Sequence, residues 1–162
     1  MRHQSHNVHN HEHSDGHPYK GLALMTVLHF LFMYAMNYLM VDAASSIFLN
    51  VNALYMTLWM VAPSVVIMIL LMKSMYPNKK LNLAISGTSI LIFVLSFVFI
   101  RNQTLVGDKQ FVRSMIPHHS GAVLMCREAK IEDAELKALC GQIIEGQLRE
   151  IEDMKKVLKR LE

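Results

Sequence analysis

Residues 43–72, AASSIFLNVNALYMTLWMVAPSVVIMILLM, form an unbroken run without a charged side chain between Asp42 and Lys73. Two similar uncharged runs lie between Lys20 and Asp42 and between Lys80 and Arg101. A helix needs about 20 apolar residues to cross the hydrocarbon of a bilayer, and it satisfies its own backbone polar groups there. The sequence therefore predicts three transmembrane helices, at about residues 21–41, 51–72 and 81–100.

These runs divide an all-α chain into three parts. Residues 1–19 are predicted to be a disordered tail, residues 20–101 a three-helix transmembrane region, and residues 102–162 a soluble helical hairpin that binds metal. The tail is rich in histidine, which chelates transition metals weakly without folding. The alternative is a solvated tail without a physiological metal. Its histidines are His3, His6, His9, His11, His13 and His17.

The loops on the two sides of the second span differ in charge. The first loop, around residues 42–50, has no Lys or Arg, whereas the second carries Lys73, Lys79 and Lys80. Positively charged loops stay in the cytoplasm. We therefore expect a three-pass protein of the bacterial inner membrane, with its N-terminus in the cytoplasm and its C-terminal hairpin in the periplasm.

The charge pattern argues against nucleic acid as a partner. The net charge is only +3, and from Arg101 onward 11 Lys and Arg alternate with 10 Asp and Glu. Such mixed signs are typical of a solvated helix surface, not of a phosphate-binding stripe. The chain also has no glycine-rich phosphate loop, nucleophile elbow or paired-carboxylate signature. We therefore do not expect an enzyme.

The C-terminal segment is predicted to form two helices, at about residues 109–130 and 134–160, with Asp108 and Asp133 as N-caps. Each helix has one apolar face. Two helices of this length cannot enclose a core by themselves. Their inward faces must meet the membrane helices, another protein or a second copy. Homodimerisation into a four-helix bundle is the simplest solution.

The strongest chemical signal is the run Met115–Cys126, MIPHHSGAVLMC. It places His118 and His119 between Met115 and Met125. Imidazole and sulfur ligands suit copper(I), silver(I) or zinc, whereas magnesium and calcium prefer oxygen. The alternative interpretation is that methionine packs in the core and that the histidines are core hydrogen-bonding residues.

Cys126 and Cys140 are expected to lie close together once the chain folds back at about residue 132. Three interpretations stay open. They form a disulfide, for which the helices must pack closely; they join the soft-metal site as thiolates; or they are small buried apolar residues.

The first span carries a stripe of soft ligands, Met25, His29, Met33, Met36 and Met40, at helical spacing. An ionisable residue within a span is a functional hypothesis by default. The stripe could pass copper(I) along the depth of the membrane. Packing by methionine is the more common explanation.

The C-terminal segment resembles the domain-of-unknown-function family numbered 305. The residues that carry the resemblance are the run DKQFVRSMIPHH from Asp108 to His119, followed by Ala122, Met125, Ile143, Gln147, Glu150, Ile151 and Met154. The resemblance implies a ferritin-like helical fold and, by analogy with CopM-type periplasmic members, copper binding through His and Met. The three-span region is similar to that of small membrane-bound bacterial members. Carried over, the resemblance points to Met115, His118, His119, Met125 and Met154 as ligands.

Together, these features predict a membrane-anchored protein that binds a soft metal, copper(I) or silver(I) before zinc, for homeostasis or resistance. The predicted ligands are His118, His119, Met115, Met125, Met154, Cys126 and Cys140. Expected partners are the lipid bilayer, further copies of the chain, and a metal chaperone or efflux protein. The alternatives are an oligomerisation module without a physiological metal and an accessory subunit of a metal transporter.

Overall fold

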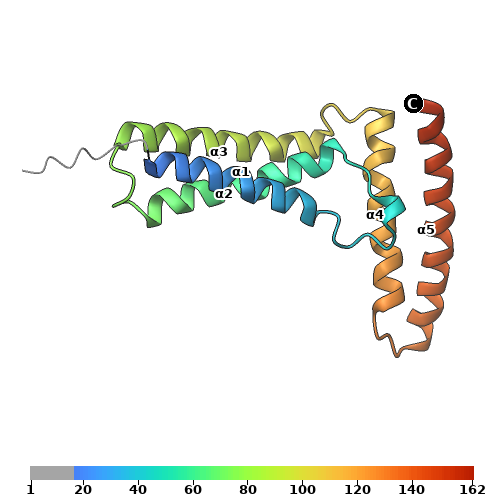
Figure 1. Ribbon diagram of the computed structural model, residues 1–162. Helices are drawn as coiled ribbons and strands as arrows, with labels where there is room; N and C mark the ends of the chain where they lie inside the picture. The colour runs from blue at the N-terminus through green and yellow to red at the C-terminus, as the bar shows by residue number, and fades with distance from the viewer. Residues whose placement is uncertain (1–16) are drawn as a thin grey trace, which may run out of the picture.

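A computed structural model describes residues 17–162, and over these residues the regular secondary structure is entirely helical (Figure 1). The predicted all-α class is confirmed. The helices are α1 (His17–Met36), a short 3-10 turn η1 (Ala44–Ser46), α2 (Val51–Leu71), α3 (Lys79–Asn102), α4 (Asp108–Glu128) and α5 (Ala134–Leu161). The predicted histidine-rich tail lies, up to residue 16, outside the described residues.

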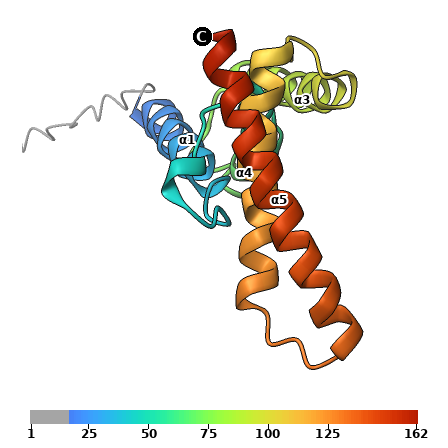
Figure 2. The same cartoon turned by 90° about the vertical axis from the view of Figure 1, so that its right-hand side faces the viewer.

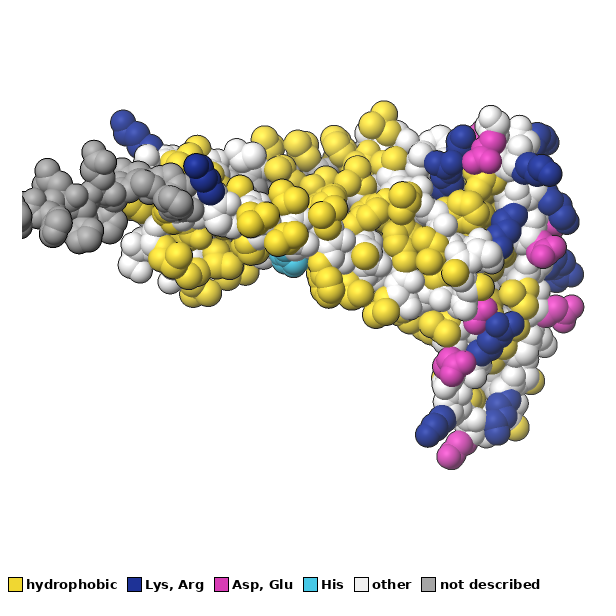
Figure 3. Space-filling view, viewed as in Figure 1, with side chains coloured by type: hydrophobic (Ala, Val, Ile, Leu, Met, Phe, Trp, Pro, Cys, Tyr) yellow, Lys and Arg dark blue, Asp and Glu magenta, His cyan; other side chains and the backbone are white. Residues whose placement is uncertain are grey.

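The helices α1, α2 and α3 are long and apolar enough to cross a membrane, judged by length and composition. The 21 residues of α2 correspond to about 30 Å of helix, the thickness of the hydrocarbon core. The helix α2 packs against both α1 and α3. Apolar side chains cover much of the outer surface of these helices in Figure 3. Soluble monomers rarely expose apolar patches of this extent. Residues 17–102 are called the spanning region below.

The helix α1 is shifted towards the N-terminus relative to the predicted span at 21–41. Within the described residues it begins at His17, and Pro18, which lacks an N–H, is well tolerated in a first helical turn. It ends at Met36, where the Asn37 side chain takes over as a donor. The Asn37 amide donates to the Met33 carbonyl and to the Thr57 hydroxyl, both at 2.9 Å. Residues 37–43 therefore leave the helix before α2 begins.

Tyrosine side chains lie at both ends of the spanning region. The rings of Tyr19 and Tyr76 lie 5.4 Å apart at the end where α1 begins. At the other end, the Tyr38 hydroxyl donates to the Phe48 carbonyl and the Tyr55 hydroxyl donates to the Thr104 carbonyl. Such aromatic side chains with a polar tip are typical of a membrane–water boundary.

The hairpin formed by α4 and α5 lies crosswise at the end of the spanning region, with α4 next to it and α5 outside (Figures 1 and 2). Both helices agree with the predicted ranges within two residues. Asp133 caps α5 as predicted, since its carboxylate accepts from the Leu136 N–H at 2.7 Å. Asp108 is instead the first residue of α4, after the N-cap Gly107. Its carboxylate still lies at the positive end of the helix dipole.

The hairpin has a small core that the spanning region helps to cover. Its buried residues are Val112, Ile116, Ile151 and Leu158, and Phe48 from the segment before α2 packs against them. Three ways to cover the inward faces of the hairpin were predicted. Contact with the spanning region is the one found within the chain itself.

Polar contacts fix the hairpin in place on the spanning region. The Asp42 N–H donates to the Ser120 hydroxyl at 2.9 Å, and the Asp42 carboxylate pairs with Arg127 at 2.7 Å. The Asn52 amide donates to the Ser114 hydroxyl at 3.2 Å. These contacts set the face that α4 presents to the spanning helices.

Candidate metal site

The two adjacent histidines of α4 lie in different surroundings. Consecutive residues of a helix project about 100° apart, and the ring centroids of His118 and His119 are 6.0 Å apart with their planes tilted by 58°. His118 lines a cleft towards the spanning region. His119 lies against Glu150 of α5. The two rings therefore face different neighbours.

The cleft that His118 lines brings together three of the seven predicted ligands. It has a volume of about 500 Å³ and lies between α4 and the ends of the spanning helices. Met115 and Met125 line it together with His118, one turn before and two turns after that residue. His118 and Met125 are exposed, and Met115 is half-buried. Two thioethers and one imidazole can thus be reached from one open space.

His119 is held in a mostly buried position against an acidic partner. Its side chain is 14% exposed, and its Nδ1 lies 3.0 Å from Oε2 of Glu150. The approach is off the axis of a hydrogen bond, so that the buried Nδ1 has no aligned partner within residues 17–162. Burial lowers the pKa of His119 below its usual 6.5, and the nearby Glu150 carboxylate opposes this shift. The Glu150 side chain itself remains 56% exposed, so the partner of His119 stays in contact with solvent.

The lowered pKa of His119 predicts a hairpin that loses stability in acid. The unfolded chain binds a proton at this histidine more readily than the folded chain does, so stability rises with pH until the usual histidine pKa of 6.5 is passed. We expect the unfolding midpoint in denaturant to fall as the pH drops below about 6.5. His119→Asn should weaken this dependence. His118→Asn at the exposed neighbouring position is the matched control, and an equal effect of both variants would contradict the assignment.

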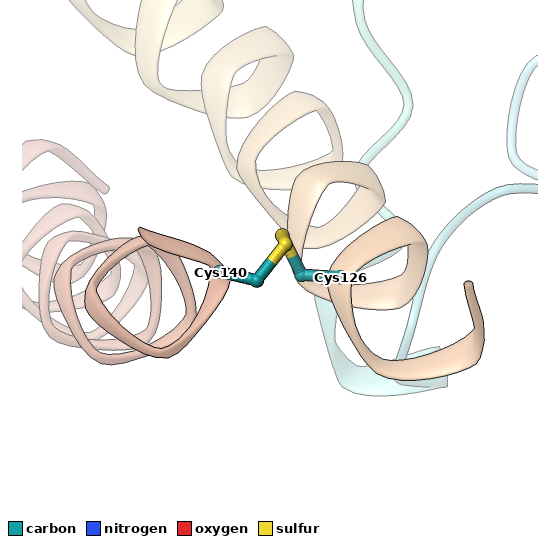
Figure 4. The surroundings of a disulfide bond; sticks show 2 residues. All are labelled: Cys126 and Cys140. Atoms are coloured by element: carbon teal, nitrogen blue, oxygen red, sulfur yellow. A yellow bond between two sulfur atoms is a disulfide. The ribbon is translucent and has the colours of Figure 1, made fainter. Parts of the chain in front are cut away.

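Cys126 and Cys140 form a disulfide between α4 and α5 near the turn (Figure 4). Their Cα atoms are 5.3 Å apart, well within the range that a disulfide requires. The two helices pack closely enough at this point for the bridge, which is the first of the three interpretations. Thiolates are the form in which cysteine binds metals. The predicted role of both cysteines as ligands does not hold for this oxidised form.

Met154 lies apart from the cleft. It packs against the buried core of the hairpin beside Ile116 and Ile151. In this position its thioether fills space between apolar side chains, a common role of methionine. The structure therefore separates Met154 from Met115, His118 and Met125.

The stripe of the first span is divided among several environments. Met25 packs against the core around Leu22, and Nδ1 of His29 lies 3.2 Å from the Ser64 hydroxyl. Met36 is exposed on the surface of α1. Met40 lines the cleft. Met25, His29, Met33 and Met36 share one side of α1, whereas Met40 lies beyond the end of that helix.

The donor chemistry of the cleft fits a soft metal. Among residues 17–162, no three His, Cys, Asp or Glu side chains come together at a spacing that could hold a metal ion. Zinc prefers such nitrogen, thiolate and carboxylate ligands. Thioethers with an imidazole suit copper(I) and silver(I) instead. The residues present therefore fit the monovalent soft ions better than zinc.

Comparison with known proteins agrees with this division of the chain. The model of a family described as domain of unknown function, DUF305, matches residues 102–160. Uncharacterized protein L153 of Acanthamoeba polyphaga mimivirus is 36% identical over 141 residues, which cover 85% of this chain and 90% of the viral protein. That alignment is longer than the hairpin and includes most of the spanning region. No solved structure matches the chain significantly.

Fold and sequence together define the class: a helical protein with three candidate membrane-spanning helices and a C-terminal helical hairpin. Within this class, residues 102–160 form a DUF305 domain, and the chain belongs to the same family as the mimivirus protein, with which it aligns over 85% of its length.

Proposed function

We propose that this protein binds copper(I) or silver(I) at the hairpin, as a membrane-anchored component of metal homeostasis or resistance. The observation that carries the proposal is the cleft in which Met115, His118 and Met125 lie together. Neutral thioethers and imidazole are soft ligands with a low preference for hard cations. The half-exposed position of these side chains keeps their donor atoms within reach of an incoming ion.

His119 does not line this cleft, and we assign it a supporting role. Its neutral, mostly buried ring stands one residue from His118 and beside Glu150. A neutral imidazole adds no positive charge near an incoming cation. His119 thereby favours metal binding at His118 without being a ligand in this arrangement.

For the location we propose the outer face of a bacterial inner membrane, with the hairpin in the periplasm. Two features support this orientation. Disulfides persist in oxidising compartments such as the periplasm, and the hairpin carries one. The lysines of the second loop, Lys73, Lys79 and Lys80, are at the end of the spanning helices opposite the hairpin, as the positive-inside rule requires.

For the assembly we propose pairing of two hairpins into a ferritin-like four-helix bundle. Leu136 of α5 is 44% exposed, and Leu139, three residues later on the same side of the helix, is also exposed. A second copy would bury these side chains, as four-helix bundles do. Native mass spectrometry of the protein in detergent should show a dimer or a higher oligomer, and Leu136→Ser with Leu139→Ser should shift it towards the monomer.

Copper(I) titration of the detergent-solubilised protein tests the proposed function. Residues 1–16 are deleted first, because their histidines bind transition metals without a fold. We expect one tight site, and we expect the triple variant Met115→Leu, His118→Ala and Met125→Leu to lower the copper(I) affinity by about 100-fold or more, since even supporting groups of metal sites contribute about 10–100-fold.

Met154→Leu is the matched control for the titration, because it removes a thioether of the hairpin that lies outside the cleft. It should leave the affinity unchanged. A protein without a tight copper(I) site, or a triple variant that binds as tightly as the original, would rule out the proposed function. Loss of stability or of oligomerisation without any dependence on metal would favour the structural module.

A further inference from the structure

The wall of the cleft opposite α4 also carries soft ligands. Met40, from the segment after α1, and Met56, from α2, line the same space as Met115, His118 and Met125. We propose that Met40 and Met56 are further ligands of this site, so that a monovalent soft metal is bound between the spanning region and the hairpin. This inference rests on the proposed function and assigns ligands to a part of the chain outside the DUF305 domain.

Met40 is brought to the cleft by direct contact with α4 at Gly121. A Cβ atom added at Gly121 would lie 3.4 Å from the Met40 carbonyl oxygen and 3.9 Å from the Met40 Cβ. Gly121 comes three residues after His118 and four before Met125, which are one turn away on the same side of a helix. Met40 therefore lies at the centre of the row that these two ligands form. Its side chain is 51% exposed, which leaves the sulfur free to turn.

Met56 is positioned through the first turn of α2. Asn52 lies one turn before it on the same side of the helix, and the Asn52 amide donates to the hydroxyl of Ser114, the residue before Met115. The Val51 N–H donates to Oε1 of Gln110 at 3.1 Å. These bonds hold α2 against the α4 turn that carries Met115. Met56 is 48% exposed, so its thioether also remains available.

The two walls of the cleft are fixed relative to each other. Asp42 is bound to Ser120 through its N–H and to Arg127 through its carboxylate. Ser120 directly precedes Gly121, and Arg127 lies two residues after Met125. Residues 40–42 are thus attached to α4 on both sides of the contact with Met40. Ligands that are held in place before binding lose less entropy when the metal enters.

The complete set of donors is four thioethers and one imidazole. Copper(I) and silver(I) are the ions that sulfur-rich sets without carboxylates select. Thioethers carry no charge and no proton at any usual pH. A site of this composition therefore takes a monovalent soft cation without releasing protons from its sulfur ligands.

Paired variants of the full spanning protein, without residues 1–16, test this assignment. Met40→Leu with Met56→Leu should lower the copper(I) affinity by at least about tenfold, the lower limit for groups that support metal sites. It should also lower the average number of sulfur ligands seen by X-ray absorption. Met36→Leu with Met75→Leu is the matched control, because both residues are exposed methionines outside the cleft. That control should change neither quantity.

A second measurement uses the unaltered ligands and so does not depend on how a variant folds. Silver(I), which is redox-inert under these conditions, is added before mild oxidation, and methionine sulfoxide is located by mass spectrometry. Met40 and Met56 should be protected together with Met115 and Met125, whereas Met36 and Met75 should oxidise as they do without silver.

The outcomes separate this inference from the proposed function. Unchanged affinity of the Met40 and Met56 variant, with Met40 and Met56 oxidised at the normal rate, would overturn the inference while the hairpin ligands remain. Absence of any tight copper(I) or silver(I) site in the parent protein would overturn both.

Discussion

Replacing Ile116 by alanine should lower the free energy of unfolding by about 2–5 kcal/mol, the usual cost of truncating a fully buried isoleucine. Ile116 is 0% exposed and lies in the hairpin core with Val112, Ile151 and Leu158. The loss combines the removed apolar contacts with the cavity that remains. Denaturant unfolding in detergent, monitored by limited proteolysis of the hairpin, measures the difference in the free energy of unfolding between the variant and the original protein.

The control for this substitution is Leu148→Ala, which removes an aliphatic side chain of similar size from an exposed position of α5. It should cost far less than the Ile116 variant. Equal losses from the two variants would mean that the core of the hairpin does not lie where α4 and α5 meet. Because Ile116 stands between Met115 and His118 in the chain, the variant should also weaken copper(I) binding.

Replacing both Cys126 and Cys140 by serine should destabilise the hairpin by about 3 kcal/mol, the value expected for a disulfide that closes a loop of about 15 residues. The two cysteines are 14 residues apart, and the bridge restrains the unfolded hairpin next to its turn. The same loss should follow from treating the original protein with a reductant. Thermal unfolding with and without the reductant measures it.

The double-serine variant also serves as the control for the reductant treatment. The reductant should not change the thermal unfolding of this variant, because it has no disulfide to reduce. The variant also separates two roles of the cysteines. In the oxidised protein, copper(I) affinity should be unchanged by the serines, because neither sulfur is a thiolate. A large loss of affinity in air-oxidised protein would show that the sulfurs are ligands and would contradict the disulfide. A count of free thiols in freshly purified protein checks the bridge directly.

The helical class and the spanning helices could be predicted because their signal is local. Long uncharged runs exclude most alternatives to a membrane helix, and α2 agrees with its predicted range within one residue. The C-terminal end of α1 was less predictable. It depends on the bond from Asn37 to Thr57 of α2, which is a tertiary contact.

The candidate site could be predicted in its residue types but only partly in its geometry. The sequence places His118 and His119 side by side, yet the helix directs the two rings to different neighbours. Which face meets the spanning region depends on contacts such as that of Asp42 with Ser120 and Arg127, between residues about 80 positions apart. Met56 carries no signal in the sequence beyond being one methionine among 13. The sequence pattern placed Met40 in the stripe of the first span, whereas in the structure Met40 lines the cleft.

The crosswise position of the hairpin determines how another molecule can reach the cleft. The helix α4 separates the cleft from α5, and α5 forms the outermost layer (Figure 1). A soluble protein that comes straight down onto the hairpin meets α5 and its charged side chains, and not the methionines. An ion that enters this cleft therefore reaches it from the flank, between α4 and the ends of the spanning helices, and not through α5.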